Sequence, residues 1–179
     1  IPFEEINRQI SKVEYKDNSE QLVSLLAKIS GNTRFEWWNA VIYYENMELG
    51  EKKMELRDLK KLEDAEAVRS TNENLVEIGR QLKENAVNMD SSARQNINDY
   101  MVTLDGIRIF NEMGLFVMAE RNGQDVKPDF ALAERLEKWY MSYKEMWRRN
   151  SKEGDLHHIS DIIFWYADLL RGRKRNKVK

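Results

Sequence analysis

Apolar residues recur every three or four positions along most of the chain, which is the spacing of one face of an α-helix. A first helix is predicted by the apolar positions Phe3, Ile6, Ile10 and Val13. A second helix is expected after Asn18–Ser19, with Gly31 as its C-cap. Its apolar positions are Leu22, Leu25, Leu26 and Ile29. The start of the chain therefore predicts two short amphipathic helices.

Two further helix starts are indicated by residues with the spacing of a capping box. In this motif a Ser or Thr side chain and a Glu three residues later each bond a free backbone N–H. Thr33 with Glu36 is expected to open a third helix, which continues past Gly50. Ser70 with Glu73 has the same spacing and is expected to open another helix.

The centre of the chain combines a charged segment with a long apolar pattern. The stretch 51–69 is rich in charge and carries only a thin apolar stripe. Ser91 or Ser92 is expected to open a long helix, and the loop 121–128 is the clearest break after it.

The last part of the chain predicts two helices, at 129–150 and about 155–171, with Pro128 at position N1 of the first and Asp129 as an acid of its first turn. The apolar stripe of the first is Leu132, Leu136, Trp139, Tyr143 and Met146, flanked by Tyr140 and Trp147. The apolar stripe of the second helix is Leu156, Ile159, Ile163, Tyr166 and Leu170, flanked by Ile162, Trp165 and Leu169. Two broad apolar faces joined by a short loop favour a packed αα-hairpin. We expect these aromatic residues to form core, and the alternatives are a stacking platform for sugars or bases and an interdomain contact.

Together these patterns predict an all-α protein, an antiparallel bundle of about seven or eight helices with no sheet. The chain has only two prolines, and its glycines are scattered, which suits neither an all-β nor an α/β protein. We expect a single helical domain over 1–172, with a sub-boundary near 122–128. A basic tail, 173–179, is expected to be disordered.

Composition and charge narrow the class of protein. In 179 residues, 34% charged and 41% apolar residues are typical of a folded globular chain. The longest apolar run, 162–167, is far shorter than the roughly 20 residues of a membrane span. There is no cysteine, which excludes disulfides and thiolate chemistry, and the sequence does not fix the compartment. The basic tail could bind nucleic acid, but the body is acidic and would repel phosphate, so we expect a solvated tail.

Candidate chemistry is sparse. His157 and His158 are adjacent, so on a helix they point about 100° apart and cannot share a metal ion. They are the only two histidines, which excludes the paired Glu-x-x-His motifs of a di-iron bundle. No phosphate-binding loop or nucleophile motif occurs, and the spacing of the many acids selects no acid–base pair. We therefore expect no catalytic residue, no cofactor and no metal ion.

The C-terminal segment resembles a known family. The pattern that carries the resemblance is Tyr143, Met146, Trp147, Arg148, Arg149, Asn150 and Leu156. It is similar to the helical tail that follows the catalytic barrel in bacterial β-N-acetylhexosaminidases of glycoside hydrolase family 20. The segment 36–63 also resembles the helices that precede this tail, so the resemblance extends over about 33–172.

The resemblance implies a non-catalytic role for this chain. The adjacent Asp-Glu catalytic dipeptide of the family does not occur in it, and 179 residues leave no room for a β/α barrel. The chain begins with Ile1, so we expect an excised C-terminal accessory domain whose catalytic domain lies upstream in the parent protein. The expected partner is that catalytic domain, with Trp147, Arg148 and Asn150 as the candidate interdomain contact. The sequence does not exclude a homo-oligomer. The alternative function is a helical protein- or nucleic-acid-binding module that uses the basic tail.

Overall fold

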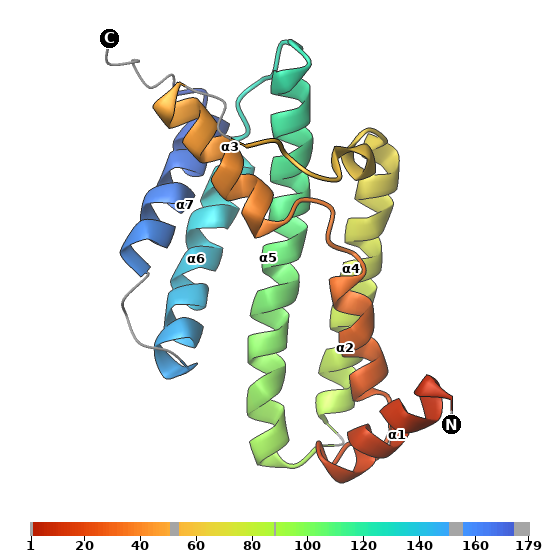
Figure 1. Ribbon diagram of the computed structural model, residues 1–179. Coiled ribbons are helices and arrows are strands. Elements are labelled where there is room, and N and C mark those ends of the chain that lie inside the picture. The colour runs from red at the N-terminus through yellow and green to blue at the C-terminus, as the bar shows by residue number, and fades with distance from the viewer. Residues whose placement is uncertain (1, 51–53, 88, 151–155, 174–179) are drawn as a thin grey trace.

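The computed structural model describes residues 2–50, 54–87, 89–150 and 156–173. In these ranges the protein is all helical and contains no strand, which confirms the predicted fold class (Figure 1). Its helices are α1 (Phe3–Val13), α2 (Leu22–Ser30), α3 (Trp37–Leu49), the 3₁₀ helix η1 (Leu59–Leu62), α4 (Ala65–Ala86), α5 (Ser91–Arg121), α6 (Phe130–Asn150) and α7 (Leu156–Leu170).

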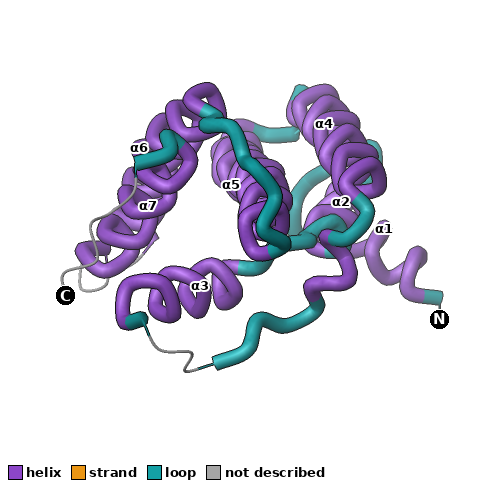
Figure 2. The backbone as a smooth tube through the Cα atoms, turned by 90° about the horizontal axis from the view of Figure 1, so that it is seen from above, coloured by secondary structure: helices purple, strands orange, loops and turns teal. Residues whose placement is uncertain are grey.

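The long helix α5 is the axis of the bundle. It packs against α4 on one side and against α6 on the other, and consecutive helices from α4 to α7 run antiparallel (Figure 1). Helix α2 lies on α4, and α7 lies on α6. Helix α3 crosses the bundle obliquely and contacts α7, as the view from above shows (Figure 2). The short helix α1 lies beside α2 at the opposite end.

Two hydrophobic clusters fill the bundle, and α5 contributes to both. The first joins the C-terminal half of α5 to α3, α6 and α7, with Ile109, Met113, Leu136, Ile163 and Tyr166 among its buried members. The second joins the N-terminal half of α5 to α2 and α4, with Leu22, Leu75, Leu82, Ile97 and Leu104 among its members. The predicted tail 173–179 lies almost wholly outside the described residues, which end at Arg173.

Aspartates, not the predicted Ser and Thr residues, cap the helices. Asp64 accepts a hydrogen bond from Ala67 N and starts α4, so Ser70 lies inside that helix and the capping box at Ser70 is wrong. Asp90 accepts a hydrogen bond from Ala93 N and starts α5, one residue before the predicted Ser91. A carboxylate on the first turn also interacts favourably with the helix dipole, which a hydroxyl does not.

The box at Thr33 is also wrong. Helix α3 begins at Trp37 with Glu36 at the N-cap and no side-chain cap hydrogen bond. Gly50 follows in the left-handed conformation (φ 66°) as its C-cap, and 51–53 lie outside the described residues.

Pro128 is not at position N1 either. Asp129 takes the N-cap role for α6, its Oδ1 accepting a hydrogen bond from Leu132 N at 2.9 Å.

The α6–α7 hairpin is present, and its most buried aromatic residues are Tyr140 and Tyr166, each 1% exposed. The Tyr140 hydroxyl donates to Leu156 O at 3.2 Å and joins the two helices of the hairpin. The Tyr166 hydroxyl donates to Ala40 O at 2.7 Å and joins α7 to α3. Trp139 and Tyr143, predicted as the centre of the stripe, lie at its edge and are only partly buried.

Candidate functional site

The predicted interdomain residues lie in the last turn of α6. The Trp147 ring is partly buried and contacts Tyr143 in a tilted arrangement, with ring centroids 6.0 Å apart. Arg148 is exposed, whereas Arg149 binds Asp99 of α5. The side chain of Asn150 lies outside the described residues. Trp147 is thus the last residue in a row of aromatic side chains along α6, and the interdomain role of Trp147, Arg148 and Asn150 stays a prediction.

The two histidines do not form a metal site. Both are exposed on α7, and His157 Nε2 lies 4.0 Å from Asp161 Oδ2. Within the described ranges, no group of three or more His, Asp or Glu side chains is arranged to hold a metal ion. No helix in the described part of the chain has the length and apolarity needed to cross a bilayer.

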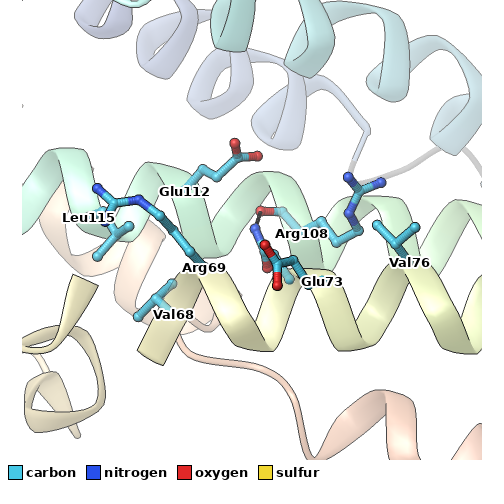
Figure 3. A pocket seen from close by; sticks show the side chains of 8 residues that line it. Val68, Arg69, Glu73, Val76, Arg108, Glu112 and Leu115 are labelled. Carbon is cyan, nitrogen blue, oxygen red and sulfur yellow. Dashed lines mark hydrogen bonds between the residues drawn. The ribbon is translucent and has the colours of Figure 1, made fainter. Parts of the chain in front are cut away.

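Two shallow hollows lie on either side of α5, and Arg108 lines both of them. The first, about 250 Å³, lies between α4 and α5 and is lined by Arg69 and Glu73 of α4 and by Arg108 and Glu112 of α5 (Figure 3). The second, about 360 Å³, lies between α5 and α6 and is lined by Asp105 and the Trp139 ring among others. The sequence did not indicate these hollows, because their residues are ordinary for a solvated helix face.

The cations around the hollows are matched by acids. Arg135 Nη1 donates to Glu112 Oε1 at 3.0 Å, and its Nη2 lies 2.8 Å from Glu112 Oε2. Arg108 Nη1 lies 3.5 Å from Asp105 Oδ1. These pairs leave no concentrated charge for an ionic ligand, so the arrangement supports helix packing rather than binding.

A buried amide ties the loop before α3 to α5. Asn111, with no exposed surface, accepts hydrogen bonds from Arg34 N at 2.7 Å and Phe35 N at 3.3 Å. Its Nδ2 donates to Asn32 O and to Asn72 Oδ1, both at 2.9 Å. Each polar atom of the side chain is therefore satisfied, which identifies Asn111 as a structural residue. No local pattern in the sequence indicates this role, since the partners of Asn111 lie far away along the chain.

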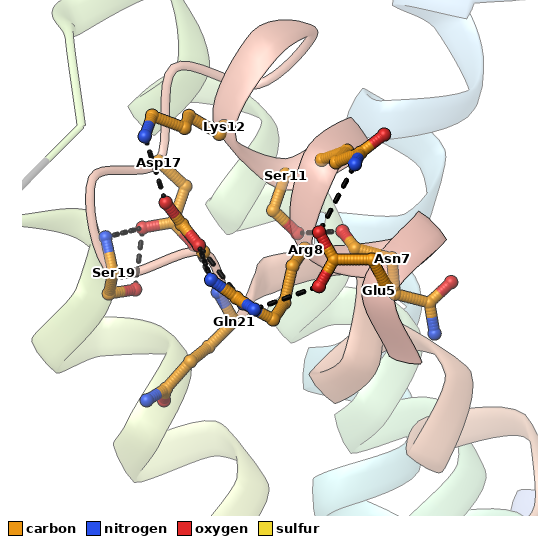
Figure 4. A network of polar contacts seen from close by, with 10 residues as sticks. Glu5, Asn7, Arg8, Ser11, Lys12, Asp17, Ser19 and Gln21 are labelled. Atoms are coloured by element: carbon orange, nitrogen blue, oxygen red, sulfur yellow. Dashed lines mark hydrogen bonds and ion pairs between the residues drawn. The ribbon is translucent and has the colours of Figure 1, made fainter. Parts of the chain in front are cut away.

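A second polar network holds α1 on α2 (Figure 4). Ser11, fully buried, donates from Oγ to Asn7 O at 2.8 Å and accepts from Val23 N at 3.0 Å. Glu20, in the turn between the helices, binds Arg8 at 2.7 Å and Lys12 at 3.1 Å. We call Arg8, Ser11, Lys12, Asp17 and Glu20 the α1 clamp.

Asp17 is the centre of this clamp. Its carboxylate accepts four hydrogen bonds: from Ser19 N (2.9 Å) and Ser19 Oγ (2.6 Å), and from Gln21 N (2.8 Å) and Leu22 N (2.9 Å). Burial alone would raise the pKa of Asp17, but these hydrogen bonds together outweigh burial and hold the pKa below its ordinary value of 3.8. Asp17 thus satisfies the free N–H groups at the start of α2 in its ionised form.

We predict that Asp17→Asn lowers the free energy of unfolding by about 1–2 kcal/mol at pH 7, because the amide retains only one acceptor oxygen. A carboxyl whose folded-state pKa is lowered stabilises the protein above its unfolded-state pKa, and this contribution disappears as the pH falls through the folded-state value. The difference between the two proteins should therefore be constant from pH 7 to about pH 5 and shrink below about pH 4. Urea unfolding across this range measures it, with exposed Asp125→Asn as control; a pH-independent difference would contradict the role of the charge.

Comparison of the chain with models of known protein families, with curated proteins and with solved structures found no match.

Proposed function

We propose that this chain is a non-catalytic helical accessory domain of a larger glycoside hydrolase of the β-N-acetylhexosaminidase type, as found in bacteria. It would pack against the catalytic domain of the same parent protein and support it. The proposal starts from the resemblance of the segment 143–156 to the helical tails of family 20 enzymes.

One observation carries the proposal: the residues of the resembling segment build the α6–α7 hairpin. The Tyr143 and Trp147 rings contact each other along α6. Leu156 is buried at the start of α7, and its carbonyl accepts a hydrogen bond from the Tyr140 hydroxyl. A pattern that specifies how two helices pack is what related accessory domains would share, because packing constrains residue types closely. A ligand platform, in contrast, would present these rings to solvent.

The alternative function, a protein- or nucleic-acid-binding module with a basic tail, has weaker support. Arg171 binds Glu137 on α6, and Arg173 binds Asp168 on α7. These two cations are thus engaged by acids of the body, while 174–179 lie outside the described residues. Salt-dependent binding to nucleic acid that is lost when 171–179 are removed would favour this alternative.

The test compares the chain with its parent protein. We expect the full-length parent to hydrolyse an aryl N-acetylglucosaminide and the purified chain 1–179 to show no turnover. A parent truncated before this domain should keep its substrate preference but unfold at a lower temperature. Turnover by the chain alone, free of contaminating enzyme, or a parent gene that encodes no β/α barrel with an Asp-Glu pair, would refute the proposal.

A further inference from the structure

Helix α1 presents its apolar face to solvent. The residues Phe3, Ile6, Ile10 and Val13, which we call the α1 stripe, lie on one side of the helix. Their exposed fractions are 85%, 37%, 37% and 59%. A stripe of this kind normally covers a hydrophobic core. Here neither of the two core clusters includes any of its residues.

The opposite, polar face of α1 determines this orientation. This face carries the three members of the α1 clamp that belong to the helix, Arg8, Ser11 and Lys12 (Figure 4). Ser11 is fully buried, and Arg8 and Lys12 both bind Glu20. The backbone is fixed as well, since Ser11 O accepts a hydrogen bond from Asp17 N at 3.0 Å. Rotating α1 to bury its stripe would leave Val23 N without the Ser11 hydroxyl as acceptor and would separate Arg8 and Lys12 from Glu20. Unsatisfied buried polar groups cost about 1–3 kcal/mol each, so the protein holds the stripe outward.

The size of the stripe limits what can cover it. One aromatic and three aliphatic side chains, each partly exposed, offer an apolar patch of a few hundred Å², the range in which patches on monomers are often functional. A stable dimer buries about 800 Å² on each partner, roughly twice as much. A small contact of this kind suffices when both surfaces belong to one polypeptide, because the link raises their effective concentration to the millimolar range. The small area of the α1 stripe therefore favours contact with a domain of the same polypeptide over contact with a second copy of this chain.

Charge argues against a lipid surface. Interfacial helices carry Lys and Arg on the polar face, where these residues reach anionic headgroups. On α1 the two cations, Arg8 and Lys12, are held by Glu20, while Glu4 and Glu5 add negative charge in the first turn. Two acids and two bases leave α1 without the net positive charge that attracts such helices to anionic lipid.

We propose that the α1 stripe docks on an apolar patch of the parent protein's catalytic domain, so that α1, at the far end of α5 from α3, is the anchor between the two domains. This inference rests on the proposed function and adds the residues of the contact. It adds a second candidate contact to the one predicted in the last turn of α6.

The test uses Phe3→Gln with Val13→Gln, which replaces the two most exposed residues of the stripe (85% and 59%), both in the chain 1–179 and in the full-length parent. In the chain alone we expect an unchanged melting temperature, since the side chains are exposed and exposed substitutions have small effects. In the parent we expect the single melting transition to split in two and limited proteolysis between the domains to accelerate at least about tenfold. The matched control is Val76→Gln with Met141→Gln, which replaces apolar residues that are 50% and 59% exposed on α4 and α6. It should leave both proteins unchanged.

Any other outcome contradicts the inference, and the kind of outcome identifies which part of it is wrong. If the parent contains the barrel but its melting and proteolysis do not respond to the stripe variant, the docking surface is wrong while the proposed function stands. If the parent contains no barrel, the proposed function and the inference fail together. If the purified chain sediments as a dimer that the variant abolishes, the occupant is a second copy. If it floats with phosphatidylserine vesicles and the variant does not, the occupant is a membrane.

Discussion

Replacing Trp139 with alanine is expected to lower the free energy of unfolding by about 3–5 kcal/mol, the usual loss on removing a large packed aromatic side chain. Although Trp139 is only partly buried, its indole joins α6 to α5. Nε1 donates to Val102 O at 2.8 Å, and the ring lies edge-on to Phe110 with centroids 5.7 Å apart. The contact is so close that a Cβ on Gly106 would lie 2.7 Å from Trp139 Cζ2. The variant therefore loses a hydrogen bond and leaves a gap between two helices.

Two control variants separate this role from simple loss of surface. Trp38 on α3 is 49% exposed, so Trp38→Ala removes an equal volume at a much smaller loss. Arg148→Ala should lower the free energy of unfolding by less than about 1 kcal/mol, as expected for an exposed arginine. Urea unfolding of the three variants measures the difference. If Trp139→Ala unfolds like the unmodified chain, the aromatic residues of α6 form a surface platform and the packing argument fails.

Adding one methyl group at Gly114 is expected to lower the free energy of unfolding by about 2–3 kcal/mol, as overpacked substitutions do. Gly114 lies in α5 where the chain before α3 and η1 both approach the helix. A Cβ there would lie 2.6 Å from the Cβ of Phe35 and 2.9 Å from Leu62 Cδ2. The Phe35 Cβ is attached directly to the backbone, and Phe35 N donates to Asn111, so the residue cannot move away without breaking that bond. Thermal or urea unfolding of Gly114→Ala provides the measurement.

Gly79→Ala is the matched control, because it makes the same chemical change inside α4. The nearest atom to a Cβ at Gly79 is Met101 Cε at 3.1 Å, the far end of a flexible side chain that can turn aside. Alanine is favoured over glycine inside a helix by about 1 kcal/mol, so this variant should be as stable as the unmodified chain or more so. If both variants respond in the same direction, helix propensity dominates and the close approach at Gly114 is unimportant.

The sequence predicted the elements that depend on local periodicity. The all-α fold, the long helix after Asp90 and the C-terminal hairpin all follow from apolar residues repeated over several turns, and these signals are redundant. Helix starts depend on single residues, so a second residue that suits an N-cap nearby is enough to misplace them. Asp64 and Ser70 both suit an N-cap, and only the packing of α4 selects the earlier one.

Features that join distant segments were not predictable from one sequence. Asn111 reads as one polar residue in a long helix, and nothing local indicates that it accepts from Arg34 N, 77 residues away. Periodicity also could not say where the α1 stripe points. It establishes that a helix has an apolar face, whereas the polar contacts of Ser11 and Asp17 decide which face meets the rest of the protein. The candidate contact at Trp147, Arg148 and Asn150 rests on resemblance alone and stays a prediction.

Helix α5 also sets the unit in which the protein loses its structure. At 31 residues it is roughly 46 Å long, and one continuous backbone supplies Ile97 and Leu104 to one cluster and Ile109 and Met113 to the other. If one cluster unfolds, the half of α5 that packs in it loses its apolar contacts. The backbone hydrogen bonds of that half still continue into the half that remains packed. The unfolding of the two clusters is thus coupled through the continuous helix α5. The amide protons at the centre of α5 should therefore exchange with solvent only when the whole bundle unfolds.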